Sequence, residues 1–149
     1  MTSKTCKVPL KVGDTYSFTK TISESDVYLF GGITGDFSQM HFNAEFMKHT
    51  MYKSRIAHGV LVFALGCTPG TLLQQKVNSP IPSASYGYDR LRFIKPVYIG
   101  DTITAVYTVS EIDEANMKTF SKVEIFNQHG DIVVAATHIL KFFPLEEDK

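Results

Sequence analysis

Residues 56–67, which read IAHGVLVFALGC, decide the fold of this chain because they open its most apolar run. The segment from Val60 to Cys67 is apolar all round, and a helix of that kind must be buried on every side. The β-branched residues also allow a buried strand, and periodicity alone does not separate the two. Length favours a helix, since the apolar pattern resumes after Thr71. Pro69 should kink or split this helix, because it removes a backbone hydrogen bond and crowds the preceding turn.

Downstream of a loop at residues 78–83, the chain reads as β-strand. Four segments are rich in β-branched or alternating residues and are bounded by turn signals: residues 85–93, 102–111, 117–127 and 132–143. Sequential strands joined by short turns predict an antiparallel sheet. One long buried helix followed by such strands gives an α+β fold class, and the simplest packing wraps the sheet around the helix. At least one sheet edge would stay bare in a single copy, so we expect two copies to pair.

Upstream of the central helix, shorter elements are expected. Residues 15–21 are β-prone and form a short strand. Ser23 and Asp26 form an imperfect capping box for a helix that stops near Gly31 or, at the latest, at Gly35. Asn43 can cap a second short helix over residues 44–47.

These elements predict one domain with two short extensions. Residues 1–14 are expected to be an N-terminal arm, residues 15–143 the domain, and residues 144–149 a solvated C-terminal tail. A chain of 149 residues is large enough for a real core and small for two domains.

Composition excludes several function classes. Fifteen basic residues balance fifteen acidic ones without a basic run, which argues against nucleic acid as a partner. The N-terminus lacks the apolar core of a signal peptide, and no apolar run approaches the roughly 20 residues of a membrane-spanning helix. The two cysteines, Cys6 and Cys67, make neither a metal-binding spacing nor a disulfide framework. We therefore expect a soluble, cytoplasmic protein, and we expect Cys67 to be a buried packing residue.

The segment 34–41, TGDFSQMH, shows no clear helix or strand period and lies between two predicted helices. Asp36 and His41 can supply a carboxylate and an imidazole that hold a water and move protons in both directions. The carboxyl must be desolvated to act as a useful base. Backbone donors around Gly59 could bind an oxygen that becomes negative in the transition state. These parts suit addition of water to, or its removal from, a molecule with a polarised carbonyl.

The same residues resemble a known family. GDFSQMH at 35–41, IAHG at 56–59 and RFIKPVYIGD at 92–101 are similar, in this order, to motifs of the MaoC-like (R)-specific enoyl-CoA hydratases, which have a hotdog fold. The resemblance covers roughly residues 15–143. It implies that Asp36 and His41 are the catalytic pair and that the Gly59 amide binds the thioester carbonyl of an acyl-CoA. It also implies a homodimer or higher homo-oligomer, and neither a metal nor a redox cofactor.

Two residues depart from the family pattern. Ser38 and Gln39 stand where the family usually has Asn and Pro, which shortens one hydrogen-bonding side chain and loosens the turn. We place Ser38 and His58 with Gly59 in the substrate-binding set. His58 is expected to orient the helix start through hydrogen bonds, and a metal-ligand role is not expected of it.

Two other functions compatible with this fold stay open. One is an acyl-CoA thioesterase, but hotdog thioesterases generally carry an acid on the central helix and the run from Val60 to Cys67 has none. The other is a non-catalytic acyl-CoA binding domain, which the replacements Ser38 and Gln39 make conceivable.

Overall fold

The computed structural model describes residues 7–145, so parts of the predicted arm (1–6) and of the predicted tail (146–149) lie outside it. The described chain forms five strands and five helices: β1 (Thr15–Thr21), α1 (Glu24–Thr34), α2 (Gln39–Phe42), α3 (Ala44–Met47), α4 (Gly59–Ala64), α5 (Cys67–Lys76), β2 (Ser83–Phe93), β3 (Thr102–Asp113), β4 (Lys118–Phe126) and β5 (Ile132–Phe142).

The strands form one antiparallel sheet in the order β1-β3-β4-β5-β2. The antiparallel prediction is confirmed, although β2 and β3 are not neighbours despite following one another in the chain. The segment between them crosses to the far side of the sheet, and β2 pairs with β5 instead. The inward side chains of β3 alternate regularly with outward ones, and Ile103, Ala105 and Tyr107 are almost completely buried. Their apolar face packs against the central helix.

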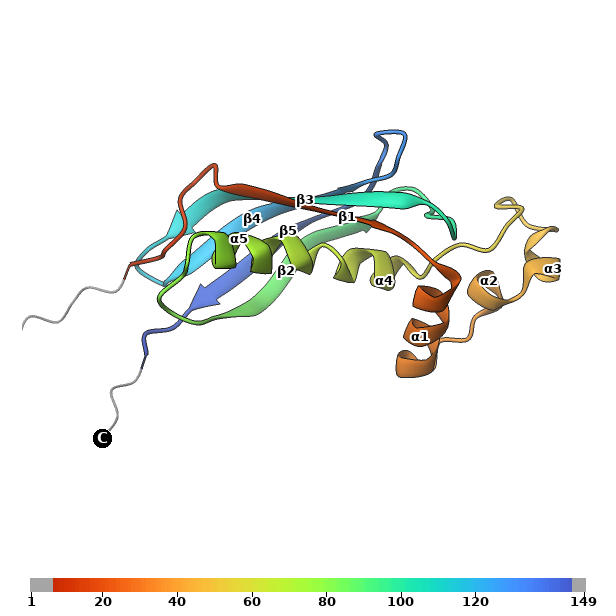
Figure 1. The fold of residues 1–149 in the computed structure, drawn as a ribbon, viewed down its shortest axis with the longest axis horizontal. Helices are drawn as coiled ribbons and strands as arrows, with labels where there is room; N and C mark the ends of the chain where they lie inside the picture. The colour runs from red at the N-terminus through yellow and green to blue at the C-terminus, as the bar shows by residue number, and fades with distance from the viewer. Residues whose placement is uncertain (1–6, 146–149) are drawn as a thin grey trace, which may run out of the picture.

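The central helix is split into α4 and α5, which lie end to end along one face of the sheet (Figure 1). The predicted break occurs, in the turn that precedes Pro69. A proline cannot donate to the carbonyl four residues back, which here belongs to Leu65, and its ring crowds that carbonyl. Gly66 lies in the break, and its backbone passes close to β4. A side chain would not fit there, because a Cβ would lie 2.7 Å from Cγ1 of Val123.

A buried polar network lies between α5 and the sheet. The Tyr107 hydroxyl lies 2.9 Å from Nδ1 of His138, and Nε2 of His138 lies 2.9 Å from the Ser85 hydroxyl. Burial lowers the pKa of His138 to about 4 and raises the pKa of Tyr107 to about 12, so both side chains are uncharged at neutral pH. The prediction that Cys67 is buried is wrong: it is exposed, and its Sγ lies 3.0 Å from the Tyr88 hydroxyl. The side chain lines an open cavity between α5 and the sheet, together with Ser85 and His138, which apolar periodicity did not reveal.

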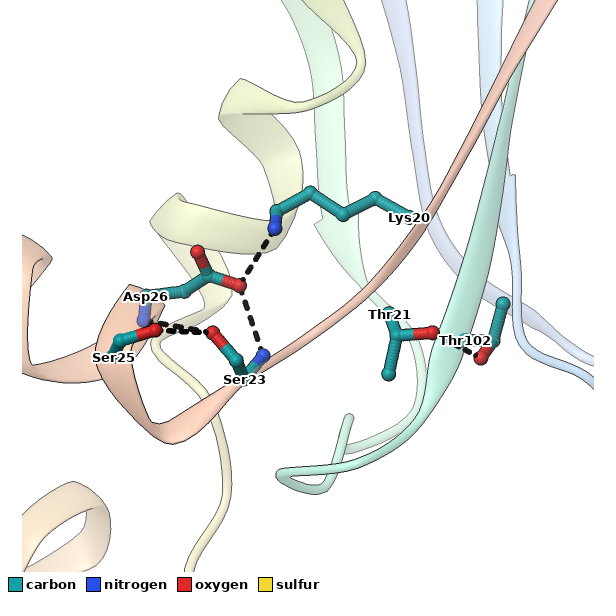
Figure 2. Close-up of polar contacts among 6 residues, drawn as sticks. All are labelled: Lys20, Thr21, Ser23, Ser25, Asp26 and Thr102. Atoms are coloured by element: carbon teal, nitrogen blue, oxygen red, sulfur yellow. Dashed lines mark hydrogen bonds and ion pairs between the residues drawn. The ribbon is translucent and has the colours of Figure 1, made fainter.

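The N-terminal elements are held by local caps. Figure 2 shows the capping box of α1: the Asp26 amide donates to the Ser23 hydroxyl at 3.1 Å, and the Ser23 amide donates to the Asp26 carboxylate at 2.9 Å. The same carboxylate lies 3.0 Å from Nζ of Lys20 in β1, which ties the helix start to the sheet edge. Val8 and Leu10, in the predicted arm, are buried in the core.

Candidate active site

The predicted loop 34–41 leaves α1 through Gly35, whose φ of 78° lies in the left-handed region that glycine adopts easily. The expectation of an irregular loop is only partly right, because the loop ends in the short helix α2. The Ser38 hydroxyl caps α2 by accepting from the Met40 amide at 3.4 Å, and the Met40 carbonyl accepts from the Ile56 amide at 3.1 Å. A helix of four residues depends on such contacts, which sequence periodicity does not show.

His41 lies on α2 and is buried. Its Nδ1 lies 2.7 Å from the Ile56 carbonyl oxygen. A carbonyl only accepts, so Nδ1 carries the proton and Nε2 keeps a lone pair. Burial lowers the pKa of His41, and the nearby His58 adds to this, while the Ile56 carbonyl and Asp36 oppose it. His41 is therefore a neutral imidazole at pH 7, ready to accept a proton at Nε2.

His58 is the residue before α4 and is only 2% exposed. Its Nε2 lies 3.0 Å from the backbone carbonyl oxygen of Asp36, so the Nε2 proton is donated to that carbonyl. This bond joins the helix start to the loop, as predicted for an orienting residue. The other nitrogen, Nδ1, is buried and has no hydrogen-bond partner among the described residues. The ring lies over that of His41, with centroids 3.7 Å apart.

Asp36 completes the cluster from the exposed side of the loop. One ligand atom from each of Asp36, His41 and His58 can be chosen so that the three lie within 4.8 Å of one another, so these residues could also hold a metal ion. All three line a cavity of about 260 Å³, to which Gly59 also contributes. The structure therefore brings together four of the five predicted site residues. Ser38 is not among the residues that line this cavity; its amide instead donates to the Asp36 carboxylate at 3.2 Å, and a contact with substrate stays a prediction.

Gly59 is the first residue of α4, so its N–H has no acceptor within the helix and is available to a ligand. Packing against Phe93 also favours glycine at position 59. A Cβ at this position would lie 2.9 Å from Cδ1 of Phe93. A second cavity of about 340 Å³ adjoins Gly59 and His41, and most of its lining is apolar: Met40, Tyr52, Ile56, Ala57, Val60, Val62, Phe93, Ile94, Pro96, Val97 and Val134, with Lys95 as the charged exception.

Arg55 supports the site from outside, and the sequence offered no signal for it. Its guanidinium contacts the Glu24 carboxylate and donates to the Tyr28 hydroxyl at 3.1 Å, both on α1. The hydrogen bond with Arg55 lowers the pKa of Glu24. The hydrogen bonds with Glu24 and Tyr28 raise the pKa of Arg55. Because Arg55 precedes Ile56, whose carbonyl orients His41, this contact links α1 to the position of the imidazole.

An antiparallel sheet packed against a central helix is the hotdog fold, and an acid and an imidazole beside the helix start are groups that a hydratase or dehydratase could use. The chain belongs to the family described as MaoC like domain, whose model matches residues 8–130. No helix described between residues 7 and 145 is both long and apolar enough to cross a membrane.

Known proteins agree with this assignment. The chain is 42% identical over 113 residues to an (R)-specific enoyl-CoA hydratase of Rhodospirillum rubrum, covering 74% of each protein. The solved structure of the (R)-hydratase from Aeromonas caviae superposes with a TM-score of 0.78 at 28% identity, over 89% of this chain and 96% of that one. An R-hydratase from Pseudomonas aeruginosa gives a TM-score of 0.75 at 28% identity, over 96% and 94% of the two chains.

Proposed function

We propose that this protein reversibly adds water to the double bond of an enoyl-CoA thioester, giving the (R)-3-hydroxyacyl-CoA. The observation that carries the proposal is the convergence of Asp36, His41 and Gly59 on one small cavity, with Nε2 of His41 left free by the bond at Nδ1. The adjoining apolar cavity suits an aliphatic acyl group. The names of the relatives support the same reaction and the same hand of product.

In the hydration direction, the thioester carbonyl accepts a hydrogen bond from the Gly59 N–H, which draws electron density from the conjugated double bond. A water held between Asp36 and His41 attacks the β-carbon, and its proton passes to Nε2 of His41. The imidazolium is stabilised by the Asp36 carboxylate and returns the proton to the α-carbon, so that the elements of water are added across the double bond. Dehydration runs the same steps in reverse.

We further propose that the working enzyme is a homodimer in the cytoplasm. Among the described residues, β2 has a strand partner on one side only, and its outer edge is free to pair with a second copy. Large apolar side chains are exposed on and beside this strand: Tyr86, Phe93, Ile94 and Val60. Asp36 is also exposed in the single chain, and a second copy that covered it would supply the desolvation that a carboxylate base needs. A monomer in sedimentation experiments at working concentrations would contradict this part of the proposal.

The test of the reaction is loss of enoyl absorbance when the pure protein is mixed with enoyl-CoAs of several chain lengths, beginning with crotonyl-CoA. Asp36→Asn and His41→Ala should each abolish turnover, while His49→Ala, at an exposed histidine outside the cluster, should not. Unchanged thermal unfolding would show that the inactive variants are folded. Retention of most activity in either site variant would refute the mechanism. Release of free thiol without loss of the double bond would identify a thioesterase instead.

A further inference from the structure

The histidine cluster has a feature that hydration does not require. Nδ1 of His58 is a buried nitrogen whose lone pair has no partner among residues 7–145, and the ring lines the 260 Å³ cavity. A buried polar atom without a hydrogen bond is unfavourable, so an external ligand that supplies a partner is favoured there. The ligand must accept electron density, because Nδ1 is the unprotonated nitrogen of this tautomer.

Each of the two imidazoles has one ring nitrogen hydrogen-bonded to a backbone carbonyl. His41 donates its Nδ1 proton to the Ile56 carbonyl, and His58 donates its Nε2 proton to the Asp36 carbonyl. Each ring therefore keeps one free lone pair and is held in orientation by a backbone carbonyl. Metal-binding histidines show this pattern: the ring nitrogen that does not bind the metal donates to a carbonyl or carboxylate, which fixes the tautomer.

A carboxylate supplies the third ligand. We propose that His41, His58 and Asp36 form a site for a divalent transition-metal ion, of which Zn²⁺ is the type, and that the bound ion inhibits the enzyme. Zn²⁺ is commonly held by three protein nitrogen or oxygen ligands, with a fourth position left for water.

The two rings lie over one another, with centroids 3.7 Å apart and an interplanar angle of 31°, so they must tilt for both lone pairs to face one ion. Tetrahedral Zn²⁺ with bonds of about 2.0–2.1 Å holds its ligand atoms about 3.4 Å apart. One possible ligand atom from each of the three residues lies within 4.8 Å of the other two, and the exposed Asp36 side chain can rotate toward the imidazoles. Hard cations such as Mg²⁺ prefer oxygen ligands and should bind poorly to two imidazoles.

The bound ion should inhibit the enzyme because it binds atoms that the proposed reaction requires. The ion occupies the Nε2 lone pair of His41 and the Asp36 carboxylate, which are the groups proposed to hold and activate water. This consequence rests on the proposed function, whereas metal binding itself does not. Added Zn²⁺ should therefore compete with the thioester substrate, and EDTA should restore the rate.

The experiment uses tag-free protein and titration calorimetry with Zn²⁺ in the absence of substrate, supported by the visible absorption of bound Co²⁺. Wild-type protein should bind one ion per chain and should not bind Mg²⁺. His58→Gln keeps a side-chain N–H near the Asp36 carbonyl but removes the imidazole lone pair. It should weaken Zn²⁺ binding by about 100-fold or more, because loss of an outer partner alone costs roughly 10- to 100-fold.

The matched control is His49→Gln, which removes an exposed histidine outside the cluster and should leave binding unchanged. Asp36→Asn alters an exposed side chain and provides a second variant if His58→Gln does not fold; it should also weaken binding. Equal Zn²⁺ affinity in wild type, His58→Gln and Asp36→Asn would overturn the proposal, as would loss of binding in His49→Gln. Zn²⁺ binding by a protein that hydrates no enoyl-CoA would refute the proposed function and leave the metal site standing.

Discussion

Replacing Gly59 with alanine tests whether this glycine is required by packing, by substrate, or by both. The new Cβ would lie 2.9, 3.0 and 3.1 Å from Cδ1, Cε1 and Cγ of Phe93, so the ring must move. Inserting a methyl group into a packed contact typically costs about 1–3 kcal/mol. The Phe93 side chain is half exposed and can turn, and alanine gains up to about 1 kcal/mol in helix propensity. The expected net loss is about 1 kcal/mol, equivalent to a fall in Tm of about 2–4 °C for a chain of this size.

A double-mutant cycle with Phe93→Ala, followed by urea unfolding, separates the two causes. Without the ring, Gly59→Ala should become neutral or slightly stabilising, which corresponds to a coupling of about 1–2 kcal/mol between the two positions. The same destabilisation in both backgrounds would refute the packing argument. Turnover provides the second readout: if substrate approaches the Gly59 amide closely, the double variant stays slow compared with Phe93→Ala alone.

Three further outcomes are expected. Arg55→Ala should lower kcat more than it raises KM, because the Ile56 carbonyl that orients His41 is then no longer held to α1 through its neighbour Arg55. Arg55→Lys should restore part of the rate. Unchanged kinetics in Arg55→Ala would show that Arg55 does not position His41. The free energy of unfolding in urea should fall by up to about 3 kcal/mol as the pH drops from about 6.5 to 4, because His138 binds a proton in the unfolded chain but stays neutral when buried. His138→Gln should flatten this pH profile, and an unchanged profile would count against this explanation. Gly66→Ala should destabilise by about 1–3 kcal/mol through overpacking against β4, measured by urea unfolding, and no loss would show that the helix break can absorb the methyl group.

Local patterns predicted much of the fold. The strand over residues 15–21 has the predicted bounds, Ser23 and Asp26 form both bonds of the capping box, and Asn43 caps α3. The four later strands differ from their predicted bounds by no more than a few residues. These features depend on residues close in sequence, where capping and alternation have a direct physical meaning.

Features that depend on distant contacts could not be predicted in the same way. The order of strands in the sheet follows from pairing of β2 with β5, and no turn residue encodes that choice. The proximity of Asp36, His41 and Gly59 was expected mainly from the family resemblance, because spacing along the chain does not show which side chains meet in the fold. The free lone pair of His58 depends on a bond to the Asp36 carbonyl, and the role of Arg55 on contacts with α1. Both appear only when the chain is folded.

The most direct test of the proposed function is the configuration of the product formed when the wild-type protein hydrates enoyl-CoAs from short to medium chain length. We expect loss of the conjugated double bond and formation of the (3R)-hydroxyacyl-CoA, with neither seen in Asp36→Asn. Formation of the (3S) product, or no hydration of any chain length by folded dimer, would contradict it.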